Sequence, residues 1–285
     1  MSSINTHTQL CGVLGNPIEH SLSPAIHNAA FQHLELNYAY LAFRVEDIQG
    51  AIQGIRALGN LRGFSVTIPH KVSSMGYLDE VDQTARHIGA INTIVKTNDT
   101  LAGFNTDAAG ALQALRQAQV PLSDSHVAIV GSGGAARAIA FGLALNSPIK
   151  GLTLLGIDDD ERKRLAQDLR QKTSLSVEDS HLDQTSLTQS INQAQVLIHC
   201  TPVGMNPHHD ATPIPDELLK PHLTVMDIVY NPLETRLLRE AREAGCVTIR
   251  GIDMFLHQAV AQFELWTSQP APVTVMRQVL ESHFS

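Results

Sequence analysis

Lys71 is the residue whose type and place suggest proton chemistry most directly. It follows the short apolar run 64–68 and the rigid Pro69, so we expect it at the end of a strand, held in a fixed position. A lysine at such a place can donate a proton to, or accept one from, a hydroxyl or carbonyl group. Taken alone, a solvated loop lysine is the commoner interpretation, so a second feature is needed.

The segment 103–110, GFNTDAAG, supplies that second feature. Asn105, Thr106 and Asp107 present an amide, a hydroxyl and a carboxylate at consecutive positions between two glycines. Such a set presents several polar groups that can bind a polar ligand. The same three residues also form a good start for a helix, and both interpretations stay open.

A glycine-rich turn gives the strongest local signal for a cofactor. The run HVAIV at 126–130 predicts a strand, and the segment after it predicts a helix. Between them lie Gly131, Ser132, Gly133, Gly134 and Ala135. Glycines in that setting allow a tight turn and let backbone amides approach a pyrophosphate at the helix N-terminus. We therefore favour dinucleotide binding over an ordinary strand-to-helix turn.

Asp158 occupies the place that meets the adenosine ribose in such folds. It follows the predicted strand LTLLGI, with Asp159 and Asp160 beside it. A carboxylate there accepts from the 2′-hydroxyl of NAD and repels the 2′-phosphate of NADP. Arg162 or Lys163 could offset that repulsion by reaching back, and three aspartates also simply favour a helix N-terminus. On balance the residues favour NAD over NADP.

The elements that position these residues indicate an α/β protein. In the first part of the chain, apolar patterning predicts strands at 10–14, 38–45 and 64–68 and a hairpin of 91–96 and 101–104 around Asn98-Asp99. Helices are predicted at 48–58 and from Ser23, with Ser23 as N-cap and Pro24 as the first helical residue.

From His126 onward, strands and helices alternate as in a doubly wound, Rossmann-like dinucleotide-binding domain. Expected strands are LTLLGI, VLIHC, LTVMDIV and CVTI, with helices from about Asp159 and over TRLLREAREA. Two more helices, 253–266 and 273–283, have no place in that sheet, so we expect them to return to the first domain. The expected domains are 1–107, completed by 252–285, and 108–251.

Composition limits the function classes. With 285 residues, 43% hydrophobic residues and a net charge of −8, the chain can bury a core and carries no basic surface for nucleic acid. No apolar run is long enough to span a membrane, and the first ten residues lack a signal-peptide pattern. Three widely spaced cysteines and the isolated pair His208-His209 suggest neither disulfides nor a metal site, so we expect a cytoplasmic protein without a metal.

Eight segments, in order along nearly the whole chain, resemble the shikimate dehydrogenase family. They are SLSP (21–24), SVTIPHK (65–71), GAINT (89–93), GFNTDAAG (103–110), GSGGAARA (131–138), CTPVGM (200–205), DIVYNPLETRLL (227–238) and GIDMFLHQA (251–259). The resemblance implies reversible nicotinamide-dependent reduction of 3-dehydroshikimate to shikimate, a step in aromatic amino acid biosynthesis on the chorismate pathway. It also implies an N-terminal substrate domain, a Rossmann-like cofactor domain, and a monomer or homodimer acting on a small molecule.

The same resemblance assigns roles by position. Lys71 and Asp107 look like the catalytic pair, with Asp107 orienting the lysine and a substrate hydroxyl. The implied substrate ligands are Ser21, Ser23, Thr67, Asn92, Tyr230 and Gln258. Besides the glycine-rich turn and Asp158, the implied cofactor neighbours are Thr201, Met205 and Gly251. Several short donors suit a polyhydroxylated acid, because buried hydroxyl groups left unpaired are costly.

Two departures from the family pattern bear on specificity. The usual Asn-Arg-Thr at the 2′-phosphate is replaced by Gly156, Ile157 and Asp158, and Ser65 stands where many members carry asparagine. The first change is compatible with an NAD-dependent quinate/shikimate dehydrogenase, whereas the paired serines of SLSP resemble the shikimate-preferring branch. A non-catalytic shikimate-sensing relative is the alternative from another class, although Lys71 and Asp107 count against it.

Overall fold

The computed structural model describes residues 4–284, which form two compact units. Unit 1 contains residues up to Thr106 together with those from Gln258, and unit 2 contains Asp107–His257. The first three residues of the N-terminal segment discussed above lie outside the described residues. Within 4–284, none of the helices is both long and apolar enough to cross a membrane.

Unit 1 contains a mixed sheet whose strands run in the order β2-β1-β3-β5-β6-β4. The strands are β1 (Gln9–Gly15), β2 (Tyr38–Arg44), β3 (Leu61–Val66), β4 (Glu80–Val81), β5 (Thr93–Thr97) and β6 (Thr100–Phe104). The first three pair in parallel, and β5 and β6 form an antiparallel hairpin with Asn98 at positive φ in its turn. The carboxyl ends of β1 and β3 therefore lie side by side.

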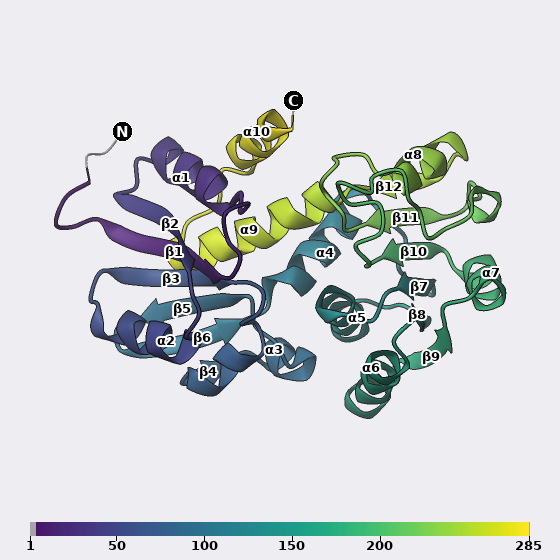
Figure 1. The fold of residues 1–285 in the computed structure, drawn as a ribbon, viewed down its shortest axis with the longest axis horizontal. Helices are drawn as coiled ribbons and strands as arrows, with labels where there is room; N and C mark the ends of the chain where they lie inside the picture. The colour runs from purple at the N-terminus through teal and green to yellow at the C-terminus, as the bar shows by residue number, and fades with distance from the viewer. Residues whose placement is uncertain (1–3, 285) are drawn as a thin grey trace. The chain divides into compact units, whose positions relative to one another are not determined.

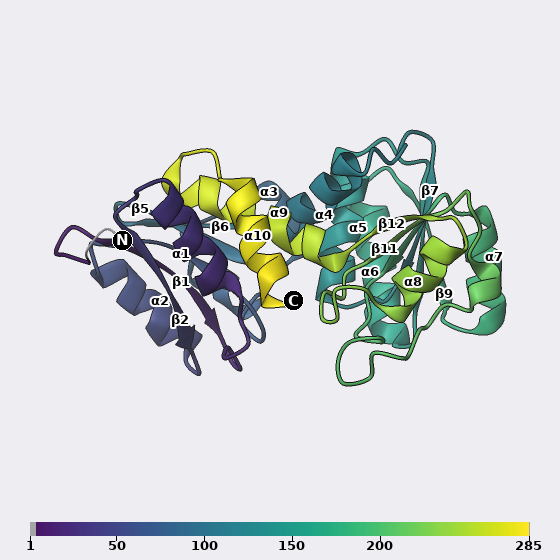
Figure 2. The same cartoon turned by 90° about the horizontal axis from the view of Figure 1, so that it is seen from above.

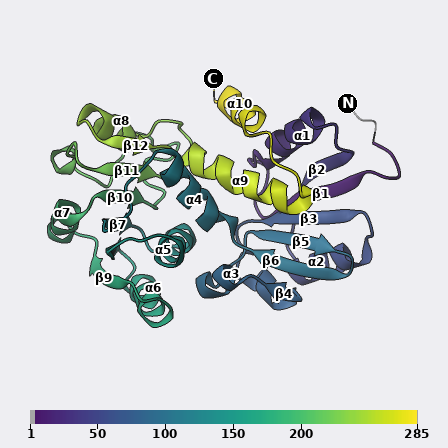
Figure 3. The same cartoon turned by 180° about the vertical axis from the view of Figure 1, so that it is seen from behind.

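Helices cover both faces of this sheet. They are α1 (Ser23–His33), α2 (Ile48–Ala57), the short α3 (Gln83–Ile88), the second part of α9 (Gly251–Thr267) and α10 (Val273–His283). A short 3-10 helix, η1, spans Ser73–Tyr77. Figures 1 and 3 show α2 on one side of the sheet and α1 with α10 on the other, and α10 packs along α1. The expected return of the C-terminal helices is what the structure shows: Trp266 of α9 donates a hydrogen bond to the carbonyl of Ile94 in β5 at 3.0 Å.

Unit 2 is a doubly wound domain with an all-parallel sheet, ordered β12-β11-β10-β7-β8-β9. Its strands are β7 (His126–Val130), β8 (Gly151–Gly156), β9 (Ser176–His181), β10 (Val196–His199), β11 (Thr224–Asp227) and β12 (Val247–Ile249). Renumbered along the unit, this order is 3-2-1-4-5-6 read from β9, the dinucleotide-binding arrangement. The predicted fold class is confirmed.

Two layers of helices enclose that sheet (Figures 1 and 2). They are α4 (Thr106–Gln117), α5 (Gly134–Asn146), α6 (Asp159–Lys172), α7 (Gln184–Gln193) and α8 (Arg236–Glu243), with a 3-10 turn, η2, at Asp216–Leu218. Side chains of α7 and α8 share one apolar cluster with the strands, including Ile191, Leu197 and Leu237, all at most 1% exposed. Because the chain reverses its winding between β7 and β10, their carboxyl ends border the crevice where such folds bind ligands.

Three details differ from the expectations. Ser23 is the first residue of α1 rather than its N-cap; the cap is Leu22, whose side chain cannot accept a hydrogen bond. The third strand-helix pair of the cofactor domain, β9 and α7, was not predicted, because Ser176–His181 is mostly polar. The contacts also place residues 252–257 in unit 2 rather than with 1–107, since His257 of α9 hydrogen-bonds Gln117 of α4 at 2.6 Å.

Candidate active site

Lys71 sits in the loop after β3, and that loop is fixed at several points. The Lys71 carbonyl accepts a hydrogen bond from the Ile91 amide at 2.9 Å. The preceding His70 is buried, and its Nε2 lies 2.8 Å from the carbonyl of Val45. The Ser74 hydroxyl donates to the His70 carbonyl, also at 2.8 Å. The half-buried lysine is thus carried on a backbone with little freedom, as a proton donor requires.

Asn92 joins this loop to the segment that precedes Asp107. Its Oδ1 accepts from the amide of Thr106 at 2.7 Å, and its Nδ2 donates to the Thr106 hydroxyl at 3.0 Å. The side chains of Asn92 and Thr106 are both buried. Asp107 follows as the second residue of α4, so the helix-start interpretation of this segment is correct. The network fixes the main chain one residue before the carboxylate.

The predicted substrate ligands Ser21, Ser23 and Thr67 come from two adjoining loops. The loops after β1 and β3 are tied together, because Thr67 donates to the Leu14 carbonyl and Asn16 to the Ile68 carbonyl, each at 3.0 Å. The Ser23 amide lies 3.4 Å from the Ser21 hydroxyl. Ser21 and Thr67 are half-buried and Ser23 is buried, so three hydroxyl groups gather at the carboxyl end of two neighbouring strands.

A buried polar cluster beneath these loops was not predicted. The Tyr40 hydroxyl lies 2.7 Å from the Ser65 hydroxyl, which donates to Gln262 Oε1 at 2.9 Å. The Gln262 amide in turn donates to the carbonyl of Asn92 at 3.2 Å and to the Thr93 hydroxyl at 3.0 Å. Burial raises the pKa of Tyr40, so its hydroxyl remains available as a donor. Gln262 follows the predicted ligand Gln258 by one helical turn, and residues four apart lie on the same face of a helix. That spacing could have predicted that Gln262 lies near the site.

In unit 2, the glycine-rich turn joins β7 to α5. Gly131 has φ +117°, and a Cβ there would stand 2.7 Å from the carbonyl oxygen of Cys200, so only glycine fits. A Cβ on Gly133 or Gly134 would meet no atom within 4 Å. The turn therefore packs against the loop after β10 on one side and leaves open space above its second and third glycines.

The N-terminus of α5 fits the pyrophosphate of a dinucleotide. Its N-cap, Gly133, provides no side-chain hydrogen bond, and no acidic residue lies in the first turn. By contrast, α6, α7 and α8 are capped by Asp158, Asp183 and Thr235. The amides at the start of α5 are therefore left for an anionic ligand, which the helix dipole also favours.

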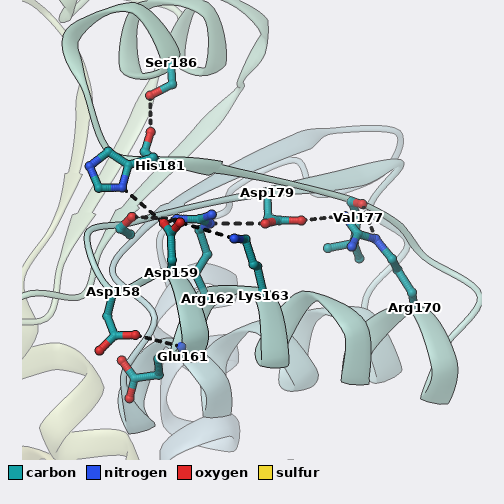
Figure 4. A network of polar contacts seen from close by, with 11 residues as sticks. Asp158, Asp159, Glu161, Arg162, Lys163, Arg170, Val177, Asp179, His181 and Ser186 are labelled. Carbon is teal, nitrogen blue, oxygen red and sulfur yellow. Dashed lines mark hydrogen bonds and ion pairs between the residues drawn. The ribbon is translucent and has the colours of Figure 1, made fainter.

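The turn from β8 to α6 carries a dense network of charges (Figure 4). The Arg162 guanidinium, 4% exposed, contacts Asp159 at 2.5 Å, Asp179 at 3.1 Å and the Gly156 carbonyl at 3.1 Å. Lys163 points to the other oxygen of Asp159 at 3.2 Å. The hydrogen bond from Arg162 is the main reason that the pKa of Asp159 lies below its usual range. Both cations that were candidates for reaching a 2′-phosphate are thus held by the network.

Asp158 is exposed beside this network and caps α6. Its Oδ1 accepts from the amide of Glu161 at 2.9 Å. The Glu161 carboxylate accepts from the hydroxyl of Ser132 in the glycine-rich turn at 3.1 Å. The helix-start interpretation of the aspartates is therefore correct, and two carboxylates face the region between β8 and the glycine-rich turn.

The remaining predicted residues of unit 2 lie after β10, after β11 and at the start of α9. Thr201 is half-buried and Met205 is exposed. Tyr230 packs against Phe255 with ring centroids 5.1 Å apart, and burial raises the pKa of its hydroxyl. A Cβ on Gly251 would stand 2.4 Å from the Ile228 carbonyl, so the start of α9 lies directly against the segment after β11.

Each unit therefore assembles its own share of the predicted residues. Unit 1 gathers the loops that carry Ser21, Thr67, Lys71 and Asn92, with Gln258 buried on α9. Unit 2 brings together the glycine-rich turn, the β8–α6 turn and the loop after β10. In the described part of the chain, no group of three or more His, Cys, Asp or Glu side chains could hold a metal ion.

Comparisons with known proteins agree with this arrangement. Residues 13–94 match the model of the shikimate dehydrogenase substrate binding domain, and residues 251–281 match that of the shikimate 5′-dehydrogenase C-terminal domain. The shikimate dehydrogenase (NADP(+)) of Methanopyrus kandleri is 42% identical over 99% of this chain and 98% of its own.

Two solved structures extend the comparison. Shikimate 5-dehydrogenase from Listeria monocytogenes, in complex with shikimate and NAD, superposes with a TM-score of 0.94 at 37% identity, covering 98% of this chain and 99% of that one. Quinate dehydrogenase from Corynebacterium glutamicum, in complex with NAD, has a TM-score of 0.90 at 28% identity, covering 96% and 99%. Both chains are matched over almost their whole length.

Proposed function

The chain belongs to the shikimate dehydrogenase family, and from this premise we propose that it catalyses the reversible, NAD(P)H-dependent reduction of 3-dehydroshikimate to shikimate. The observation that carries the proposal is the uncapped, acid-free N-terminus of α5 behind a glycine turn, in a chain that also fixes Lys71 on a braced loop. The first feature suits a dinucleotide, and the second suits a proton donor to a ketone oxygen.

The proposed roles divide between cofactor and chain. The nicotinamide, when bound, supplies the hydride to the ketone carbon or takes it up from shikimate. Lys71 donates the proton to the oxygen in reduction and accepts it in oxidation, and Asp107 orients the substrate through a hydroxyl group. The His70 imidazole holds the loop just before Lys71 and the Ile91 amide binds the Lys71 carbonyl, so the lysine side chain starts from a fixed backbone position.

The substrate carries several hydroxyl groups and a carboxylate, and the chain offers matching short donors. We propose Ser21, Ser23, Thr67, Asn92, Tyr230 and Gln258 as its ligands. The buried hydrogen bonds of Asn92 and Gln262 fix the polar floor beneath these loops. Such a site discriminates strongly against analogues that lack a hydroxyl, because its own polar groups would then be left unpaired.

We propose that NAD is used in preference to NADP, or at least alongside it. Asp158 and Glu161 face the β8–α6 turn, whereas Arg162 and Lys163 are committed to Asp159. A 2′-phosphate would meet carboxylates without a mobile cation to neutralise it. The pyrophosphate is proposed to lie on Gly131, Ser132, Gly133, Gly134 and Ala135, with Thr201, Met205 and Gly251 towards the nicotinamide.

We place the enzyme in the cytoplasm, as a monomer or homodimer. Cys11, Cys200 and Cys246 are free thiols, as a reducing compartment favours. The three cysteines pack as small buried or half-buried side chains and form no cross-links with one another.

A four-way absorbance assay tests the proposal. The purified chain is mixed with shikimate or quinate and with NAD or NADP, and formation of the reduced nicotinamide is followed. We expect turnover of shikimate with both dinucleotides and the higher kcat/KM with NAD. Faster turnover of quinate would make the chain a quinate dehydrogenase. Tight binding of shikimate without turnover would instead favour the sensing relative.

A further inference from the structure

A buried histidine and aspartate lie side by side at the carboxyl ends of two inner strands of the parallel sheet of unit 2. His199 ends β10 and Asp227 ends β11, and the two are paired in register. His199 Nδ1 is 2.9 Å from Asp227 Oδ1, and neither side chain is more than 1% exposed. Central strands of a parallel sheet are normally apolar throughout, so a buried polar pair on two such strands is unusual and requires an explanation.

The hydrogen bonds around the pair run in one direction. Asp227 accepts from the imidazole, from the amide of Val229 at 3.0 Å and from the hydroxyl of Thr235 at 2.7 Å. Since Nδ1 donates to the carboxylate, Nε2 of a neutral imidazole accepts, and its partner is the Thr201 hydroxyl at 2.5 Å. The Thr201 oxygen in turn accepts from the Val203 amide at 3.3 Å.

These bonds join the two segments proposed to hold the nicotinamide end of the cofactor. The bond to Thr201 fixes the start of the loop that reaches Met205. The bond to Val229 fixes the segment before Tyr230, and Gly251 packs against the carbonyl of Ile228. The first loop also lies against the glycine-rich turn, because Cys200 donates to the Val130 carbonyl at 2.7 Å.

We propose that His199 is a positioning residue for dinucleotide binding, acting through Thr201. Its imidazole bridges Asp227 and Thr201 by hydrogen bonds, which holds the loop after β10 in its binding conformation in the absence of the nicotinamide. The proposal rests on the proposed function, since it takes Thr201–Met205 as part of the cofactor site. A purely structural role is the weaker explanation, because a buried hydrogen-bonded polar pair seldom adds more stability than an apolar pair of the same shape.

The test is a double-mutant cycle with His199→Asn and Thr201→Val. An asparagine amide can occupy the place of Nδ1 and still donate to Asp227, but it cannot reach Thr201. His126→Asn is the matched control. His126 Nε2 contacts the Thr153 hydroxyl at 2.8 Å, and His126 begins β7, so it lies at the amino-terminal end of the strands, opposite the end that carries His199. For each variant, the dissociation constants of NAD and NADP are measured by calorimetry, with kcat, both KM values and the unfolding temperature.

We expect His199→Asn to weaken binding of both dinucleotides by about three- to tenfold, the effect of one buried hydrogen bond, with kcat and the KM of shikimate changed by less than about twofold. The double variant should bind no more weakly than Thr201→Val alone, and His126→Asn should bind normally. Unchanged dinucleotide affinity in His199→Asn, or two effects that multiply in the double variant, would overturn the proposal.

The outcome separates this inference from the proposed function. If the wild-type chain binds dinucleotide but does not turn over shikimate, the proposed activity is contradicted. The double-mutant cycle still tests the role of His199, because it depends only on the dissociation constants of the dinucleotides. If the wild-type chain binds neither NAD nor NADP, both proposals are contradicted. A lower unfolding temperature with unchanged dissociation constants assigns His199 to stability alone and contradicts positioning.

Discussion

Asp158 combines two roles at one position, the cap of α6 and a carboxylate beside the glycine-rich turn. The cap uses the hydrogen bond from the Glu161 amide, whereas the proposed selectivity against a 2′-phosphate depends on the negative charge. Serine preserves the first property and removes the second. Replacement by arginine would reverse the charge but would also remove the cap.

Asp158→Ser should therefore improve use of NADP with little loss of stability. We expect kcat/KM with NADP to rise by about fivefold, since removing one nearby like charge is worth on the order of 1 kcal/mol. Asp160→Asn, which removes another exposed carboxylate from the first turn of α6, is the control. Equal effects of the two substitutions would show that general charge, rather than the position of Asp158, sets the preference.

His27 should make the stability of the fold depend on pH. It is fully buried in α1 and stacked on Tyr40 with ring centroids 4.6 Å apart, and neither ring nitrogen has a hydrogen-bond partner among the described residues. Burial lowers the pKa of this imidazole from 6.5 to about 3. Between these values the unfolded chain binds a proton that the folded chain does not, so stability falls as the pH falls.

His27→Phe should remove part of this acid sensitivity. At about pH 4.5, two units below the unfolded value, the wild-type chain should lose about 2–3 kcal/mol of unfolding free energy through His27. Urea titrations of both proteins at about pH 7 and pH 4.5 measure the difference. The two proteins losing the same stability on acidification would contradict the assignment, whatever their stabilities at neutral pH.

At the scale of elements, α5 differs from its neighbours in having no side-chain cap. Its N-terminal amides are unsatisfied by the side chain of Gly133, whose φ of −69° and ψ of −172° suit any residue. A better cap is therefore sterically possible, because a Cβ at this position meets no atom within 4 Å. We attribute the glycine at this helix start to the dinucleotide binding proposed above.

Gly133→Asp should stabilise the fold slightly and weaken the dinucleotide. A carboxylate at the N-cap gains a few tenths of a kcal/mol over glycine and adds the favourable interaction with the helix dipole. The same charge repels a pyrophosphate, so we expect the dissociation constants of NAD and NADP to rise by at least about tenfold. Thermal unfolding and calorimetry measure the two effects, and unchanged dinucleotide affinity would remove α5 from the cofactor site.

The sequence predicted elements well where one pattern dominated. The apolar run 126–130, the glycines after it and the charged segment from Asp159 lie in β7, the following turn and α6. The polar strand β9 was missed, since its residues alternate weakly and Val177 is its only buried residue. Ser23 was misplaced by one position because Ser-Pro predicts a cap from composition, whereas the start of a helix depends on the backbone of the previous residue.

At the scale of the whole molecule, each unit has its own core and its own share of the proposed site residues. The core of unit 1 includes Ile52, Phe64 and Ile94, and that of unit 2 includes Leu197 and Val225, all at most 2% exposed. The resemblance of eight segments predicts which residues carry the chemistry, and those roles stay predictions. The sequence did not predict the buried bonds that hold these residues, such as Ser65 to Gln262, because these join residues far apart in the chain.

The central claim is that Lys71 exchanges the proton during the reaction. The direct measurement compares Lys71→Met with the wild-type chain in shikimate-dependent reduction of the nicotinamide, with both substrates varied. We predict that kcat falls by about 10²–10⁴-fold, the usual contribution of a general acid or base, while the KM values change by less than about threefold. A variant with kcat near that of the wild-type chain would contradict the claim.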